Sequence, residues 1–217
     1  MHQTMVPGSL LGLVVAGALA IGFDDERAGS LPSGWKSVIT QGALPRWEIV
    51  EDPSAPTKPN VLAQLSSEPA RAQFPLAVYE KASYRNGDLS VKFKPISGQV
   101  DQAAGLVWRY RDENNYYIVR ANALEDNVVL YKVEAGKRTS LAPKGTSANT
   151  YGVDHEVPGG RWSTLRVVFE GPLLTVFFDG EKLFEVEDTT FTEAGRVGLW
   201  TKADSVTHFD DFQITEK

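Results

Sequence analysis

The sequence predicts an all-β protein made of antiparallel sheets, and three observations predict it. Beyond residue 20 no long stretch shows the 3.6-residue periodicity of a helix. Short segments rich in Val, Ile, Phe, Tyr and Thr alternate apolar and polar residues instead, and clusters of Gly, Pro, Asn and Asp separate them. So many strands without crossover helices favour antiparallel pairing, closed as a sandwich, a jelly roll or a barrel.

The expected strands follow one another along the whole chain after the N-terminal segment. In order they cover residues 21–23, 47–50, 61–65, 76–80, 88–95, 105–111, 116–122, 128–134, 137–141, 163–170, 173–178, 182–187, 196–201 and 207–214. The proline-rich stretch 52–59 connects two of them closely, and the sequence contains no internal repeat. We therefore expect a single domain over residues 21–217.

Three hairpins can be placed in register. Asp179-Gly180 joins two alternating strands and favours a type I′ turn. Around residues 112–115, pairing Tyr110 with Tyr117 and Trp108 with Val119 divides the two strands into two faces. The expected core face carries Leu106, Trp108, Tyr110, Tyr117, Val119 and Ala121. The other face carries Val107, Arg109, Arg111, Tyr116, Ile118 and Arg120, which we expect to face solvent. The next hairpin sets Val119 beside Leu130 and Arg120 beside Val129.

The N-terminus predicts export. Residues 1–20 lack charged side chains, and LLGLVVAGAL precedes the small-x-small sequence Ala18-Leu19-Ala20 that a signal peptidase accepts. We expect a signal peptide over residues 1–20 and a periplasmic or secreted domain. The alternative is an uncleaved membrane anchor, because the uncharged stretch 5–23 falls within the about 17 to 25 residues that span a bilayer.

Composition excludes several classes of protein. Lys and Arg total 22 against 28 Asp and Glu, a net charge of −6, which argues against a nucleic-acid partner. The chain has no cysteine, so disulfides, thiolate metal sites and a cysteine nucleophile are excluded. No G-x-S-x-G, HExxH or phosphate-binding glycine loop occurs. We expect no organic cofactor, and the oligomeric state is not determined by the sequence.

Three strings of sequence resemble a known family. They are FDDERAGSLPSGW near the start, GLVWRYRDENNYYIVRANALEDNVVLYKVEAGKR in the middle and RVGLWTKADSVTHFDDFQI at the end. They look like the concanavalin A-like group that includes the 3-keto-disaccharide hydrolase domain, laminin-G-like modules and family-16 glucanases. The resemblance covers nearly everything after residue 22. It implies a two-sheet jelly-roll sandwich, with sugars bound across the concave sheet where they bind at all.

A set of polar and aromatic residues on the face expected to be open predicts a carbohydrate site. Its members are Arg109, Tyr116, Arg120, Asn122, Asn127 and Tyr131, with Trp200 and Lys202 as expected neighbours. Aromatic rings stack on the apolar side of a sugar ring, and planar donors bridge adjacent hydroxyls. The alternative is a solvated sheet surface with ordinary cross-strand pairs. Trp108 and Trp162 are assigned to the core.

Two acidic strings suggest a structural calcium ion. FDDE at 23–26 and FDDF at 209–212 supply hard oxygen ligands, and in related jelly rolls the first and last strands lie close together. The matching positions are Asp24 or Asp25 and Asp210. The alternative is that these acidic doublets only solubilise strand ends.

The sequence also bears on catalysis. The acidic strand of family-16 glucanases is absent, because Glu185-Val-Glu187-Asp188 lacks its spacing, which argues against retaining hydrolysis. Cleavage of a 3-keto-glycoside by elimination needs only a base and an oxyanion donor. Candidates are Glu125, Asp126, Asp204 and Lys202. The histidines, His2, His155 and His208, are isolated and are expected to be structural. The alternative function is a non-catalytic, laminin-G-like module that binds protein or envelope components.

Overall fold

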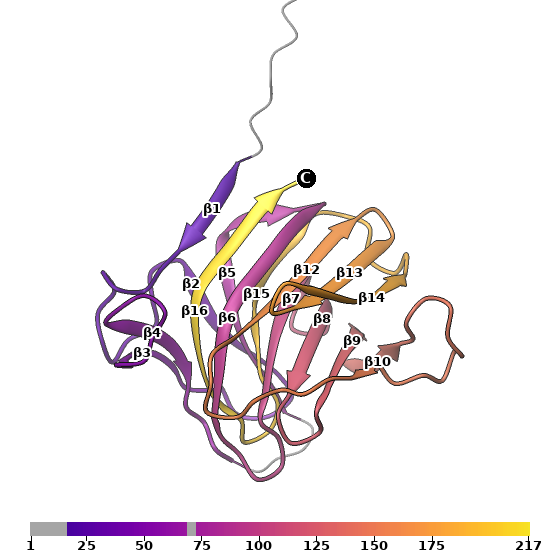
Figure 1. Ribbon diagram of the computed structural model, residues 1–217. Coiled ribbons are helices and arrows are strands. Elements are labelled where there is room, and N and C mark those ends of the chain that lie inside the picture. Colours follow the sequence, from indigo (N-terminus) through magenta and orange to yellow (C-terminus); the bar gives the residue numbers. More distant parts are fainter. Residues whose placement is uncertain (1–16, 69–72) are drawn as a thin grey trace, which may run out of the picture.

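Two antiparallel sheets packed face to face form the molecule (Figure 1). The computed structural model describes residues 17–68 and 73–217, and every regular element in them is a strand. The first sheet has the order β14 (Glu181–Glu187), β13 (Leu173–Phe178), β12 (Ser163–Glu170), β6 (Gly87–Ser97), β16 (Val206–Glu216), β4 (Asn60–Gln64) and β3 (Trp47–Glu51), and β1 (Ala18–Ile21) pairs with β16. The second has the order β10 (Lys137–Leu141), β9 (Asn127–Glu134), β8 (Asn115–Asn122), β7 (Ala103–Asp112), β15 (Gly195–Trp200), β5 (Phe74–Tyr84) and β2 (Trp35–Thr40), and β11 (Val153–Asp154) pairs with β9. The predicted jelly-roll sandwich is confirmed.

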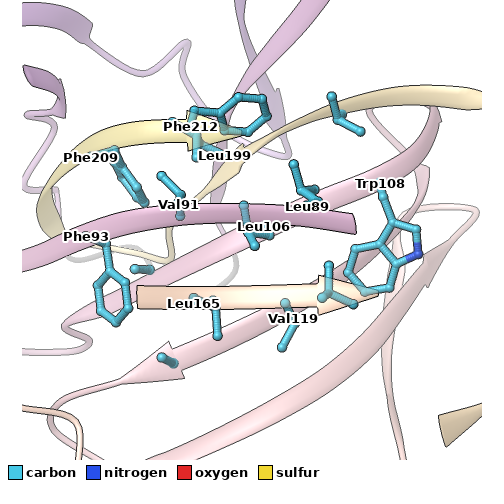
Figure 2. Close-up of a cluster of buried hydrophobic side chains, with 14 of the residues drawn as sticks. Leu89, Val91, Phe93, Leu106, Trp108, Val119, Leu165, Leu199, Phe209 and Phe212 are labelled. Atoms are coloured by element: carbon cyan, nitrogen blue, oxygen red, sulfur yellow. The ribbon is translucent and has the colours of Figure 1, made fainter. Parts of the chain in front are cut away.

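The hydrophobic core fills the space between the sheets. Figure 2 shows Leu106, Trp108, Val119 and Leu199 of the second sheet together with Leu89, Val91, Phe93, Leu165, Phe209 and Phe212 of the first. All are fully buried. Since burial of one such side chain contributes about 1.5–3 kcal/mol, this layer supplies most of the driving force for folding. Trp108 lies in the core as predicted, whereas the prediction for Trp162 is wrong. Trp162 is half-buried, and its Nε1 donates to Ser54 Oγ at 3.1 Å.

Most strands lie where the alternation places them. The ranges 137–141, 163–170 and 173–178 coincide with β10, β12 and β13. Asp179 and Gly180 have φ of 45° and 85°, the positive values that a type I′ turn requires. The sequence missed β2, whose WKSVIT segment is apolar only at scattered positions, and the two-residue β11. The strand expected at 21–23 is found at 18–21.

A β-bulge makes the expected register of the 112–115 hairpin wrong. Trp108 lies opposite Tyr117, and the register shifts between Trp108 and Asp112. The displacement is two residues, so the side chains beyond the bulge keep their expected faces. Within the bulge Arg109 has a φ of 47° and turns to the core side, where its Cζ lies 5.7 Å from the Phe169 ring. Tyr110 turns to the opposite side.

The beginning of the described chain belongs to the first sheet. In β1, Ala20 pairs with Gln213 and Ile21 with Phe212 of β16. The predicted processing site after Ala20 therefore lies within β1, and most of the predicted export segment lies outside the described residues. In residues 17–68 and 73–217 no helix has the length and apolarity to cross a bilayer.

Candidate functional site

The side of the second sheet turned away from the core carries a second buried cluster, which we call the outer aromatic face. It comprises Phe74, Leu76, Val78, Ala103, Val107, Tyr110, Tyr116, Ile118, Val129, Tyr131, Val133 and Trp200. The expectation that this face is solvated is wrong: Tyr116, Arg120 and Trp200 have no exposed surface. The outward side chains are large and pack on one another, and residues from the edge strand and a loop lie over them. A face buried without a covering sheet is an unusual feature for a sandwich.

A row across three strands forms the centre of this face. Arg120 of β8 lies opposite Gly105 of β7, and Gly105 lies opposite Trp200 of β15. A Cβ at Gly105 would lie 2.8 Å from the Val119 carbonyl oxygen and 3.3 Å from Trp200 Cβ. Glycine is the residue that fits here, and it leaves no side chain between the guanidinium of Arg120 and the indole of Trp200.

Arg120 forms the polar centre of the row. Its Nη2 donates to Asn127 Oδ1 and lies 3.0 Å from Glu125 Oε2. Asn127 Nδ2 also donates to Glu125 Oε2, at 3.3 Å. Nε and Nη1 of Arg120 are buried and have no hydrogen-bond partner in the described part of the chain. Two of the three nitrogens of this guanidinium are thus left without an acceptor, which is costly for a buried charged group.

Glu125 is the accessible member of this group, with 38% of its side chain exposed. Burial raises the pKa of its carboxyl, but the positive charge and hydrogen bond of Arg120, the Asn127 amide and the charge of Lys202 together lower it below the ordinary value. The carboxylate is therefore ionised at neutral pH and partly open to solvent.

Aromatic rings surround a second arginine above the same face. Arg138, from the edge strand β10, places its Cζ 4.4 Å from the Tyr131 ring, 4.8 Å from the Phe74 ring and 5.7 Å from the Trp200 ring. Arg120 approaches the Tyr131 ring as well, at 5.7 Å. Tyr131 therefore lies between two guanidinium groups, and stacking of each on the ring is favourable.

Tyr151 covers the same ring from the loop after β10. Its hydroxyl is hydrogen-bonded to the Tyr131 hydroxyl, and the two rings meet edge to face at 5.9 Å. Burial is the main cause that raises the pKa of Tyr131. Tyr116 lies deeper, hydrogen-bonded to Thr40 Oγ1 at 2.9 Å, and burial likewise raises its pKa.

Lys202 and Asn122 lie at the end of the row and hold its loops. Lys202 Nζ is 2.7 Å from Asp101 Oδ2, and Asn122 Nδ2 donates to Asp101 Oδ1 at 2.8 Å. Asn122 Oδ1 accepts from the Leu124 N–H at 3.0 Å. The side-chain nitrogen and oxygen of Asn122 are both hydrogen-bonded, so this residue orders the turn that carries Glu125.

Two of the predicted bases have structural partners. The Asp204 carboxylate accepts the N–H groups of Gln99 at 2.7 Å, of Val100 at 3.1 Å and of Asp101 at 3.0 Å. Burial raises its pKa, but these N–H groups outweigh burial and lower it. Asp126 accepts the Val157 N–H at 3.1 Å. Of the three predicted carboxylates, Glu125 is the one that lies beside the outer aromatic face and accepts no backbone N–H from the described part of the chain.

Arg109 does not join this site. Its Nε, Nη1 and Nη2 donate to the carbonyl oxygens of Arg85, Phe191 and Gly171 at 3.0, 2.8 and 2.7 Å. Burial lowers its pKa. A Cβ at Gly195 would lie 2.4 Å from the carbonyl carbon of Arg109, so the bulge depends on that glycine. Arg109 ties three loops together on the core side.

The structure does not gather the predicted calcium ligands into a cluster. Asp210 accepts the Thr57 N–H at 3.0 Å and the Asp211 N–H at 2.8 Å, and Asp24 accepts the Asn60 N–H at 2.9 Å. Among the described residues no three acidic or histidine side chains form a potential metal site. Calcium at Asp24, Asp25 and Asp210 stays a prediction, which a melting temperature lowered by EDTA would support.

The structure therefore brings part of the predicted set of residues together. Arg120, Asn127, Tyr131, Trp200 and Glu125 lie together as expected. Phe74, Tyr151, Arg138 and Thr40 were missed. The sequence contained a signal for Arg138. It lies in the expected strand 137–141, which pairs with β9, and alternation places it on the opposite side of that strand from Lys137.

The family to which the chain belongs follows from its sequence over almost the entire domain. Residues 23–215 match the family described as 3-keto-alpha-glucoside-1,2-lyase-like domains. The chain belongs to this family. No curated protein sequence matches the chain at a significant level.

Solved structures extend the likeness to the fold of this lyase-like domain. It is similar to the carbohydrate-binding module CBM66 from Bacillus subtilis, with a TM-score of 0.63, 18% identity and coverage of 84% of this chain and 96% of that one. It is similar to the cellulose-induced protein Cip1, with a TM-score of 0.61, 11% identity and coverage of 92% and 97%. It is also similar to domain 4 of AbnA, a GH43 extracellular arabinanase from Geobacillus stearothermophilus, in complex with arabinotriose. The TM-score is 0.55 and the identity 13%, and the match covers 91% of this chain and 90% of that one. At these identities the likeness shows the shared fold.

Proposed function

We propose that this lyase-like domain binds a carbohydrate on the outer aromatic face. The observation that carries the proposal is the row formed by Arg120, Gly105 and Trp200, where unsatisfied guanidinium N–H groups stand beside aromatic rings. Aromatic rings and planar donors are the two components of sugar recognition. The family and the carbohydrate-binding modules with the same fold support this choice of ligand.

We further propose that the domain cleaves 3-keto-glycosides by elimination. The C3 ketone acidifies the proton on C2, and the Glu125 carboxylate is the base that takes it. The electron pair forms an enolate, whose oxygen the positive groups of Arg120 and Lys202 stabilise. The enolate then reforms the ketone, a double bond forms between C1 and C2, and the C1–O bond breaks. The leaving alkoxide takes the proton that Glu125 removed from C2, which gives an alcohol and restores the carboxylate, and addition of water to the double bond would complete a net hydrolysis.

Glu125→Gln tests this chemistry, because it keeps the shape of the side chain and removes the base. With a 3-keto-disaccharide as substrate, we expect kcat to fall about 10²-fold, within the range of a lost general base. Glu134→Gln, on the exposed end of the neighbouring β9, is the matched control and keeps the activity. Full turnover by Glu125→Gln would reject Glu125 as the base. If the unmodified protein binds sugars but does not turn over the substrate, the cleavage proposal is rejected and only the carbohydrate-binding proposal remains.

The alternative is a laminin-G-like module that binds protein or envelope components. An array of neutral and acidic oligosaccharides separates the two proposals: no bound glycan, and no change in melting temperature with any of them, would contradict the carbohydrate proposal. Export through residues 1–20 stays a prediction, and sequencing the N-terminus of the protein recovered outside the cytoplasm tests it.

A further inference from the structure

We infer that the ligand of the outer aromatic face carries an anionic group, such as the carboxylate of a uronic acid, and that Arg120 and Arg138 bind it. This inference rests on the proposed carbohydrate function and names the class of sugar. The centre of the Tyr131 ring lies 5.7 Å from Arg120 Cζ and 4.4 Å from Arg138 Cζ. Two positive side chains thus share one aromatic ring at the centre of the site.

Three buried guanidinium nitrogens at this site lack an acceptor within the described residues. Nε and Nη1 of Arg120 and Nη1 of Arg138 are buried, and none has a hydrogen-bond partner in residues 17–68 or 73–217. All three are donors with no lone pair to offer. A guanidinium presents its N–H groups as a planar fork that matches the two oxygens of a carboxylate, so the group missing from this site is an acceptor with that geometry.

The positive side chains of the site outnumber the carboxylates that pair with them in the described chain. Arg120 pairs with Glu125, and Lys202 pairs with Asp101, but within the described chain no ion pair joins Arg138 to a carboxylate. Three positive side chains meet two negative ones, which leaves an excess of one positive charge. A neutral sugar hydroxyl can accept a hydrogen bond from Arg138, but only an anion neutralises its charge.

A ligand can reach the buried guanidinium of Arg120 only past the side chains of Arg138 and Tyr151, which lie over it. Arg138 is half-buried on the edge strand β10, and Tyr151 is 46% exposed in the following loop. Arg120 Cζ lies 5.9 Å from the Tyr151 ring. We expect an anionic group that pairs with Arg138 to draw this side chain from the rings of Phe74, Tyr131 and Trp200, which would expose the rings to the sugar.

The test compares charged and uncharged forms of the same sugar. The probes are trimers of galacturonic, glucuronic and mannuronic acid and the methyl ester of each, with binding measured by calorimetry. We expect at least one acid to bind about tenfold more tightly than its ester, the ratio of one charge-assisted hydrogen bond. In Arg138→Gln this ratio falls to about one.

Arg111→Gln is the matched control. Arg111 also stacks on an aromatic ring, because its Cζ lies 5.1 Å from the centre of the Phe191 ring, but it is exposed and lies outside the site. The two variants change the net charge equally, so the control keeps the preference if the effect is local. Equal binding of acid and ester, or equal loss of the preference in both variants, would overturn the inference and leave carbohydrate binding intact. Binding of no glycan, charged or neutral, would reject both proposals together.

Discussion

The outward faces of the two sheets differ in how far their positive side chains are paired with hydrogen-bond acceptors. On the first sheet, β6 and β12 alternate buried and half-buried residues, and their outward charges are paired. Lys92 lies 2.8 Å from Asp211, Lys94 pairs with Asp52, and Arg166 lies 2.6 Å from Asp88. On the second sheet β8 is buried on both faces, and two N–H-bearing nitrogens of Arg120 have no acceptor among the residues that the structure describes. The positive charges of the first face are paired within the protein, whereas the second face has buried donors on which the proposed ligand site rests.

The largest effect on stability is expected from a matched truncation of one valine on each outward face. Val107 of the second sheet has no exposed surface, whereas Val168 of the first is half-buried. Val107→Ala removes about two buried carbon groups and leaves a cavity, so we expect the free energy of unfolding to fall by about 2 kcal/mol. Val168→Ala should cost less than about 1 kcal/mol. Denaturant unfolding measures both, and equal values would show that the two faces do not differ in packing.

A smaller effect on stability is expected from matched arginine substitutions. In Arg120→Met an apolar chain of similar length replaces a buried, partly unsatisfied guanidinium, so we expect the free energy of unfolding to stay within about 1 kcal/mol or to rise. Glycan binding should fall at least tenfold. Arg166→Met removes a half-exposed ion pair with Asp88, which costs about 0–1 kcal/mol, and leaves glycan binding unchanged.

A large loss of stability in Arg120→Met would mean that this arginine holds the sheet together. A structural role of that kind would remove the main support for a site at Arg120.

The comparison also explains which features the sequence predicted. Strict alternation identified both faces of β8 and β9, and Val119 does lie opposite Leu130. Alternation says which side chains share a face, but it does not say whether that face is covered. The burial of Tyr131 depends on Arg138 and Tyr151, whose positions are set by tertiary packing of an edge strand and a loop.

Arg109 was misplaced for a different reason. One bulge between Trp108 and Asp112 reverses the sides of Arg109 and Tyr110, while the residues beyond it keep theirs. No turn residue marks the bulge within WRYRD, and the glycine that permits it, Gly195, lies far away in the sequence. A local pattern cannot predict a feature whose cause is a close approach of another strand.

The smallest expected effect is a pH dependence that belongs to the first sheet. His208 Nδ1 lies 2.8 Å from Asp52 Oδ2, and burial lowers the pKa of His208 even though Asp52 raises it. The unfolded chain therefore binds this proton more readily than the folded one. The stability contributed by neutral His208 is present above about pH 6.5 and is lost as the pH falls through the folded pKa, with a slope of at most about 1.4 kcal/mol per pH unit.

Replacing each histidine locates this slope. Unfolding free energies between pH 7 and 5 should be flatter in His208→Gln than in the unmodified protein. His155→Gln, in which the lost ring packs against Phe178 at 4.6 Å, is the control for the loss of an imidazole. The Asp52 carboxyl, whose pKa Lys94, His208 and Ser54 lower against the effect of burial, causes a further loss of stability only at more acidic pH. An unchanged slope in His208→Gln would place the proton uptake elsewhere, and the paired charges of the first sheet would then be no more sensitive to pH than those of the second.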